Sequence, residues 1–254
     1  MKLLLAEMTR LEAREAFDRG ATVVIPTGST EQHGPHLPLI VDTCTAEHIA
    51  RSAAARAASE GPIVVAPTVT YGSSHHHLPW AGSMSLSVRT YMAVIEDLIR
   101  CVAHHGGKRV ALVNGHGGNV APHDVVTSAL TLELDIAVAA VSYWTLAEKE
   151  LAAEGLDGLG GIPGHAGGFE TSLMLALRPD IINLDQRGIG VPAAPPDASW
   201  VNPRLGGLVR QLGAFEQASG VSDDASGASG ERGERLLEVA IEVVRRFLVD
   251  FARG

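Results

Sequence analysis

The chain has 254 residues, of which 46% are hydrophobic, and its 20 Lys and Arg against 29 Asp and Glu give a formal net charge of −9. This length can bury a large core, and the acidic balance argues against nucleic acid as a partner. No apolar run approaches the roughly 18 residues of a membrane span, and the apolar run before Glu7 is too short for a signal peptide, so we expect a cytoplasmic protein that binds no membrane.

Short β-branched segments alternate with helical segments along the chain. Strand composition occurs at 22–25, 63–67, 109–113 and 136–141, and helical patterns at 44–59, 88–104, 122–133, 169–177 and 231–251. Such alternation is typical of βαβ units. We therefore predict an α/β fold, organised as a single domain over residues 1–254, with a mostly parallel central sheet and helices on both faces. The Gly-, Pro- and Ala-rich stretch 185–204 is expected to be a connector.

Metal-ligating residue types gather directly after the first predicted strand, in G-S-T-E-Q-H-G-P-H-L-P-L at 28–39. Glu31 and His33 are two positions apart, so extended backbone projects both side chains to one side. Asp42 follows the turn, and its two carboxylate oxygens can bridge two ions. Because such groups must pair or hold a cation when buried, we interpret this segment as half of a two-metal site.

Two later loops can supply the other half. The loop N-G-H-G-G-N at 114–119 follows the third predicted strand and contains His116, and G-H-A-G-G-F-E-T-S at 164–172 places Glu170 in the first turn of a predicted helix. His116 can equally be a hydrogen-bonded loop histidine, and a carboxylate such as Glu170 is also favoured at a helix start by the helix dipole alone. The first of these loops, like Glu31, follows the carboxyl end of a strand, where open α/β sheets bind ligands.

The segments 26–43, 114–119 and 164–172 resemble, in sequence and in order, the three signature blocks of the creatininase family of metal-dependent amidohydrolases. The resemblance extends over about residues 20–185. It implies two divalent metal ions per subunit, Zn²⁺, Mn²⁺ or Fe²⁺. One ion would be held by residues matching Glu31, Asp42 and His116, and the second by those matching His33 and the shared Asp42.

The chain departs from creatininase itself at Gly118, where that enzyme has a ligating glutamate. Glu170 is expected to supply the missing carboxylate, and this change argues against creatinine as the substrate. His165 matches the family's proton-shuttling histidine and is expected to protonate the leaving nitrogen. The resemblance also places Ser74, Gly117 and Trp144 in the substrate pocket. The run His75 to His77 lies in the family's substrate-side loop and can line the pocket or bind metal.

The resemblance implies hydrolysis of a C–N amide bond in a cyclic amide, a formamide or a small peptide, with a metal-bridging water as nucleophile. Family members include a formamidopyrimidine deformylase and a mycofactocin precursor peptidase, and the small pair Gly117 and Gly118 leaves room for a larger substrate than creatinine. A phosphoesterase is disfavoured because no Arg or Lys cluster accompanies the three blocks. A non-catalytic, metal-stabilised protein is the remaining alternative. Members of the family are hexamers, so we expect a homohexamer.

Overall fold

The structure is a computed structural model that describes residues 1–158, 162–188, 201–202, 207–208 and 220–254. The predicted connector 185–204 lies largely outside these residues. Where it is described, residues 184–186 form a 3-10 turn and residues 201–202 pair with 207–208 as two short antiparallel strands, β5 and β6.

The four predicted strands form one parallel sheet. They are β1 (Thr22–Thr27), β2 (Ile63–Val65), β3 (Arg109–Asn114) and β4 (Ala137–Ser142), in the order β2-β1-β3-β4. In the register, Val24 of β1 lies between Val65 of β2 and Ala111 of β3. Each strand differs from its predicted bounds by no more than two residues at either end, and the parallel sheet is confirmed.

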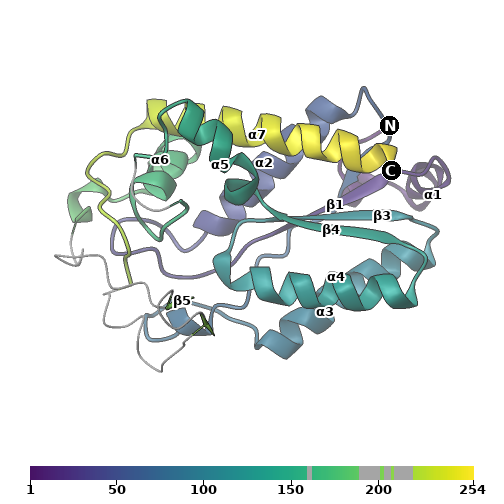
Figure 1. Cartoon of the computed structure of the whole chain (residues 1–254), viewed down its shortest axis with the longest axis horizontal. Helices are drawn as coiled ribbons and strands as arrows, with labels where there is room; N and C mark the ends of the chain where they lie inside the picture. Colours follow the sequence, from purple (N-terminus) through teal and green to yellow (C-terminus); the bar gives the residue numbers. More distant parts are fainter. Residues whose placement is uncertain (159–161, 189–200, 203–206, 209–219) are drawn as a thin grey trace.

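Seven α-helices surround the sheet within the described part of the chain. They are α1 (Arg10–Asp18), α2 (Val41–Ala57), α3 (Val88–His104), α4 (Val120–Glu133), α5 (Tyr143–Ala153), α6 (Gly168–Leu177) and α7 (Gly230–Arg253). Figure 1 shows α2, α5 and α7 on one face of the sheet and α3 and α4 on the other, which confirms the predicted layers. None of the described helices is long and apolar enough to cross a membrane.

The core is divided by the sheet into two apolar layers, because successive strand residues point to opposite faces. On β1, Val24 packs with the buried residues of α2, α5, α6 and α7, whereas Val23 and Ile25 pack with those of α1, α3 and α4. All three side chains are buried. Continuous apolar strands of this kind are typical of a parallel sheet covered on both faces.

The helix α2 begins three residues earlier than predicted, at Val41 instead of Cys44. Asp42 therefore lies in the first turn of the helix, where the helix dipole favours a carboxylate. Glu170 occupies the first turn of α6 in the same way. Two helix starts and the loops after β1 and β3 thus deliver the polar side chains to one end of the sheet.

Candidate metal centre

The five predicted metal ligands converge in the structure, although they come from three separate segments of sequence. All are buried, and they form two groups that share Asp42: Glu31 with Asp42 and His116, and His33 with Asp42 and Glu170. Within each group the potential ligand atoms lie within 4.8 Å of one another. Two groups with one common carboxylate are the arrangement expected for a dinuclear centre.

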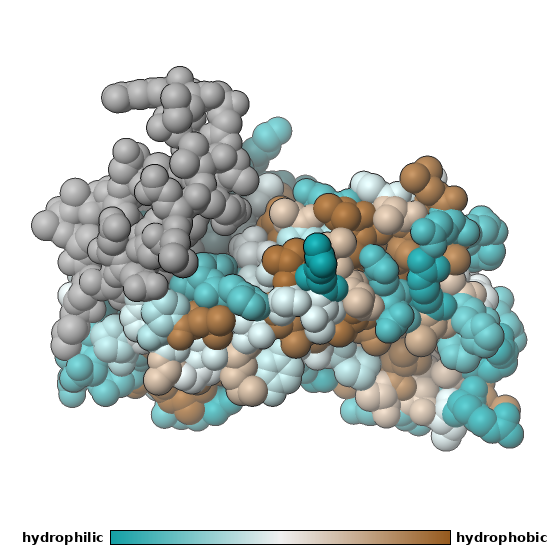
Figure 2. Space-filling model, turned by 90° about the horizontal axis from the view of Figure 1, so that it is seen from below, coloured by the Kyte–Doolittle hydropathy of each residue, from teal (hydrophilic) through white to brown (hydrophobic). Residues whose placement is uncertain are grey.

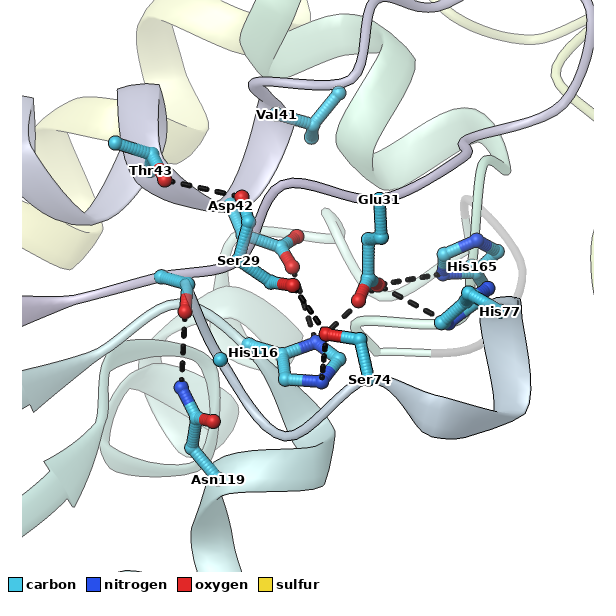
Figure 3. A network of polar contacts seen from close by, with 12 residues as sticks. Ser29, Glu31, Val41, Asp42, Thr43, Ser74, His77, His116, Asn119 and His165 are labelled. Atoms are coloured by element: carbon cyan, nitrogen blue, oxygen red, sulfur yellow. Dashed lines mark hydrogen bonds and ion pairs between the residues drawn. The ribbon is translucent and has the colours of Figure 1, made fainter. Parts of the chain in front are cut away.

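Asp42 turns its two oxygens toward different groups. Its Oδ1 lies 3.0 Å from Nε2 of His33, and its Oδ2 lies 3.0 Å from Nδ1 of His116. Figure 3 shows the carboxylate of Asp42 and the imidazole of His116 pointing toward each other, with Glu31 beside them. The two oxygens of one side chain therefore reach both halves of the centre.

A second carboxylate completes each group. In the first, Oε1 of Glu31 lies 3.2 Å from Nδ1 of His116. In the second, Oε2 of Glu170 lies 3.7 Å from Nε2 of His33 and accepts a 2.6 Å hydrogen bond from the backbone N–H of Ala166. Glu170 thus lies in one group with His33 and Asp42.

Backbone carbonyls orient both imidazoles. The Nε2 of His116 lies 3.2 Å from the carbonyl oxygen of Ser73, and the Nδ1 of His33 lies 3.2 Å from the carbonyl oxygen of Glu31. A carbonyl only accepts hydrogen bonds, so each of these nitrogens carries the proton. The opposite nitrogens, Nδ1 of His116 and Nε2 of His33, face the carboxylates, and once they give up their protons they can present lone pairs to an ion, as metal-ligating histidines do.

The donor set fits divalent metal ions. Oε2 of Glu31 is buried and has no hydrogen-bond partner among the described residues, and the buried Nε2 of His33 and Oδ2 of Asp42 have no partner there outside the candidate centre itself. Burying such atoms without a partner is costly, and a cation between them removes that cost. Carboxylate and imidazole ligands without thiolate suit Zn²⁺, Mn²⁺ or Fe²⁺.

The shifted pKa values of the site also show that its carboxylates stabilise a positive charge beside them. Burial opposes charge on His33, but the carboxylates of Asp42 and Glu170 outweigh it and hold its pKa well above the usual range. For His116, the carboxylates of Glu31 and Asp42 outweigh burial in the same way and raise the pKa to about 10. Burial raises the pKa of Glu170, against the opposing effect of His33. Protons and metal ions therefore compete for this site.

A cavity of about 280 Å³ opens onto the two groups. Its wall includes Glu31, Asp42, His116 and Glu170 from the centre, together with His76, Gly117 and His165. A Cβ atom built at Gly117 meets no other atom within 4 Å, so this residue faces open space. An accessible cavity beside the ligands is what distinguishes a catalytic from a purely structural metal site.

Ser74 and Trp144, two of the three residues predicted to bind substrate, do not line this cavity. Ser74 is fully buried behind the ligand His116, with its Oγ 3.3 Å from Nε2 of the imidazole. Trp144 lies in α5 and packs edge to face against Tyr143 within the apolar layer below α7. Gly117 is the one of the three that the structure places at the cavity.

His165, the predicted proton shuttle, lies between the centre and the cavity. Its Nε2 lies 2.9 Å from the carbonyl oxygen of Gln32 and 3.0 Å from the side-chain amide nitrogen of the same residue. Because the carbonyl can only accept, we assign the proton to Nε2, which leaves Nδ1 as the acceptor, 3.9 Å from Oε1 of Glu31. Burial, reinforced by the positive charge of His33, holds the pKa of His165 well below its usual value. Its imidazole is therefore neutral at pH 7, and it also lies close enough to Glu31 and His33 to form a third potential ligand group.

The structure separates the three histidines of the run 75–77. His75 is exposed and pairs with Oγ of Ser85 at 2.9 Å, His76 lines the cavity, and Nε2 of His77 lies 3.1 Å from Oε1 of Glu31. Sequence reasoning left the role of this run open and did not single out Gln32, whose side chain contacts His77. The only signal for Gln32 was its position between two predicted ligands.

Comparison with known proteins agrees with this geometry. The family model described as "Creatininase: Creatinine amidohydrolase" matches residues 6–248. The chain belongs to the creatininase family. It is 32% identical to the creatinine amidohydrolase of Pseudomonas putida, covering 91% of this chain and 89% of that protein. It is 34% identical to the mycofactocin precursor peptide peptidase of Mycobacterium tuberculosis, covering 89% of this chain and 84% of the relative.

Solved structures of creatininase confirm the fold. A crystal structure of creatinine amidohydrolase superposes with a TM-score of 0.80 at 29% identity and 98% coverage of both chains. A structure described as "Creatininase Mn" superposes with a TM-score of 0.81 at 28% identity, also with 98% coverage of both chains. Family membership identifies this creatininase-family chain as a hydrolase acting on C–N bonds.

The backbone of this creatininase-family chain leaves no room for a side chain at Gly118. A Cβ atom built there would lie 2.2 Å from the carbonyl oxygen of Ser73 and 2.4 Å from Nε2 of His116. Real Cβ contacts are essentially never closer than 3.0 Å, so no side chain fits without a shift of backbone. Besides the shared Asp42, the second group contains the carboxylate of Glu170.

Proposed function

We propose that this chain is a dinuclear amidohydrolase in which Glu31, Asp42 and His116 hold one divalent ion and His33, Asp42 and Glu170 hold the other. The observation that carries the proposal is the pair of buried ligand groups sharing Asp42, with ligand atoms that have no hydrogen-bond partner among the described residues outside these groups. Two bound divalent ions would supply a nucleophilic water near neutral pH and polarise the amide carbonyl. Structures of the related creatininase, one described as a Mn form and one as a Zn–Zn type, support Mn²⁺ and Zn²⁺ as the first ions to test.

His165 moves the proton in this proposal. Its imidazole is neutral, it lines the cavity, and the bond from Nε2 to the carbonyl of Gln32 makes Nδ1 the acceptor. Nδ1 can take a proton from the attacking water and return it to the leaving nitrogen, which otherwise departs as an unstable amide anion. The orienting carbonyl keeps the ring in one tautomer during the transfer.

Metal analysis followed by a substrate screen tests the proposal. The purified protein is expected to contain two divalent ions per chain and to release amine from a cyclic amide, a formamide or a short peptide. Asp42→Asn should lose both ions, while Asp18→Asn, which changes an exposed carboxylate of α1, should keep them. Full metal occupancy without release of amine from any substrate of the panel would favour the non-catalytic alternative.

The substrate class is the finer part of the proposal, and we favour a short peptide over creatinine. The open space beside Gly117 supports a substrate that extends past the metal ligands, and the similarity to a mycofactocin precursor peptide peptidase points the same way. Gly117→Val would fill this space. It should raise KM for active short peptides and leave KM for a small formamide unchanged, whereas equal effects on both would contradict peptide specificity.

Assembly and location remain part of the proposal. A homohexamer is supported by the family resemblance and by apolar side chains that stay exposed on α3 and α4: Leu98, Val125 and Leu132. Figure 2 shows apolar patches among polar ones on the face seen from below, where these helices lie in Figure 1. Sedimentation showing only a 26.6 kDa monomer at micromolar concentration would contradict the hexamer. We also propose that residues 1–254 form one domain that acts in the cytoplasm.

A further inference from the structure

His77 donates a hydrogen bond to a carboxylate of the candidate centre. Its side chain is 1% exposed, and its Nε2 lies 3.1 Å from Oε1 of Glu31. Figure 3 shows the His77 ring pointing at Glu31 from the loop after β2, on the side opposite His116. A carboxylate held from outside in this way keeps one orientation toward an ion.

The amide of Gln32 decides which nitrogen of His77 carries the proton. Oε1 of Gln32 accepts the backbone N–H of Gly34 at 2.9 Å, which fixes the amide so that Nε2 points the other way. This NH₂ group lies 2.8 Å from the carbonyl oxygen of Gly220, 2.9 Å from Nδ1 of His77 and 3.0 Å from Nε2 of His165. Because Nε2 of His165 gives its own proton to the carbonyl oxygen of Gln32, the two amide hydrogens go to Gly220 and to Nδ1 of His77. An Nδ1 that accepts a hydrogen bond leaves the proton of a neutral imidazole on Nε2, which is the nitrogen facing Glu31.

The surroundings of Gln32 hold it in this geometry. A Cβ atom built at Gly220, whose φ is +71°, would lie 2.8 Å from the amide of Gln32. The backbone at Gly220 therefore packs directly against this amide, and a side chain there would displace it. The backbone carbonyl of Gln32 meanwhile accepts the Nε2–H of His165. One residue between two predicted ligands therefore sets the tautomer of two histidines.

We propose that Gln32 and His77 are positioning residues of the metal centre: Gln32 selects the Nε2–H tautomer of His77, and His77 fixes the carboxylate of Glu31 toward its ion. This inference rests on the proposed dinuclear function. It assigns a role to Gln32, which is not among the candidate ligands, and to the histidine of the run 75–77 that contacts the carboxylate of Glu31.

Metal affinity, measured by competition with a chelator for Zn²⁺ or Mn²⁺, tests the proposal without any substrate. His77→Leu removes the donor and should weaken binding of one of the two ions by about 10–100-fold, the usual effect of losing an outer partner of a ligand. His77→Gln keeps an N–H donor at a similar reach and should restore most of the affinity. His75→Leu, a change in the same run at an exposed residue that pairs with Ser85, is the matched control and should bind both ions as the wild type does.

Gln32→Met keeps the size of the side chain but removes the donor, and it tests the first half of the proposal. It should lower metal affinity in the same direction as His77→Leu. In wild-type protein, ¹⁵N NMR of the imidazoles should show His77 protonated on Nε2, and this measurement stands even if a variant fails to fold. Protonation on Nδ1, or unchanged affinity for both ions in folded His77→Leu, would overturn the inference. A wild type that binds no divalent ion would instead overturn the proposed function, and the inference with it.

Discussion

Replacing Glu170 with glutamine is expected to remove one of the two ions from the centre. Oε2 of Glu170 accepts the N–H of Ala166 at 2.6 Å and lies 3.7 Å from Nε2 of His33. In the variant the single amide oxygen is drawn to the Ala166 N–H, which directs the NH₂ group toward His33 and the ion. An NH₂ group has no lone pair available for a cation, and a neutral amide binds a hard cation far more weakly than a carboxylate. The affinity for that ion should fall by more than the roughly 10–100-fold typical of losing an outer partner.

His165→Ala should behave differently, although it lies five residues away. As a proton carrier outside the coordination sphere, His165 can be removed with both ions retained. The turnover number should fall by about 10²–10⁴, the usual contribution of positioned acid–base catalysis. This range corresponds to about 3–5 kcal/mol of activation free energy.

Elemental analysis of the dialysed proteins and steady-state kinetics on an active substrate separate the two roles. Loss of an ion in His165→Ala would show that His165 is itself a ligand, in the group it can form with Glu31 and His33. Two ions with full turnover in Glu170→Gln would show that another side chain completes the second group, with His76 and His77 as the first residues to test. Either result would refute the assignment of Glu170 as a metal ligand and of His165 as a proton carrier.

Three further outcomes are expected. Gly118→Ala should lower the melting temperature and metal affinity, because its Cβ would lie 2.2 Å from a carbonyl oxygen, whereas Gly117→Ala, with nothing within 4 Å, should do neither. Gly233→Ala in α7, whose Cβ would lie 1.9 Å from a carbonyl oxygen of α6, should destabilise the fold by about 1–3 kcal/mol in urea unfolding with an unchanged m-value. The carboxylates of Glu31 and Asp42 outweigh burial and raise the pKa of His116 from 6.5 to about 10. Protonated His116 therefore stabilises the folded, metal-free protein. This stabilisation is fully present below pH 6.5 and is lost as the pH rises toward 10. The melting temperature of that form should fall over this range, and calorimetry in buffers of different ionisation enthalpy should detect proton release on metal binding at pH 7; no release would contradict the assignment of His116 as a ligand.

The sheet was predictable from sequence because its strands are short, β-branched and buried on both faces, which leaves a local signal. The start of α2 at Val41 was harder to predict, because the residues just before Cys44 are polar and obscure the helical pattern. The five candidate metal ligands could be predicted because their types are costly to bury without a cation and lie in glycine-rich blocks that resemble those of the creatininase family, and the structure brings them together.

Other parts of the site have no local signal. Whether Ser74 faces a cavity or the back of an imidazole depends on how the loop after β2 packs, and the structure places it behind His116. Gln32 matters through His77 and through Gly220, which is 188 residues away in sequence. Hydrogen-bond partners at that separation are set by tertiary packing, so only the folded chain reveals them.

The charge of the centre connects its fold to its chemistry. Glu31, Asp42 and Glu170 place three carboxylates in one buried site, two of them in first turns of helices whose dipoles favour negative charge. With neutral imidazoles the ligands carry three negative charges, and two divalent cations would leave a net charge of about one positive unit. No Lys or Arg is among the described residues that line the cavity. This balance suits the single negative charge that develops on an amide oxygen during hydrolysis, and it is poorly matched to a phosphate ester, whose greater charge requires a cationic clamp.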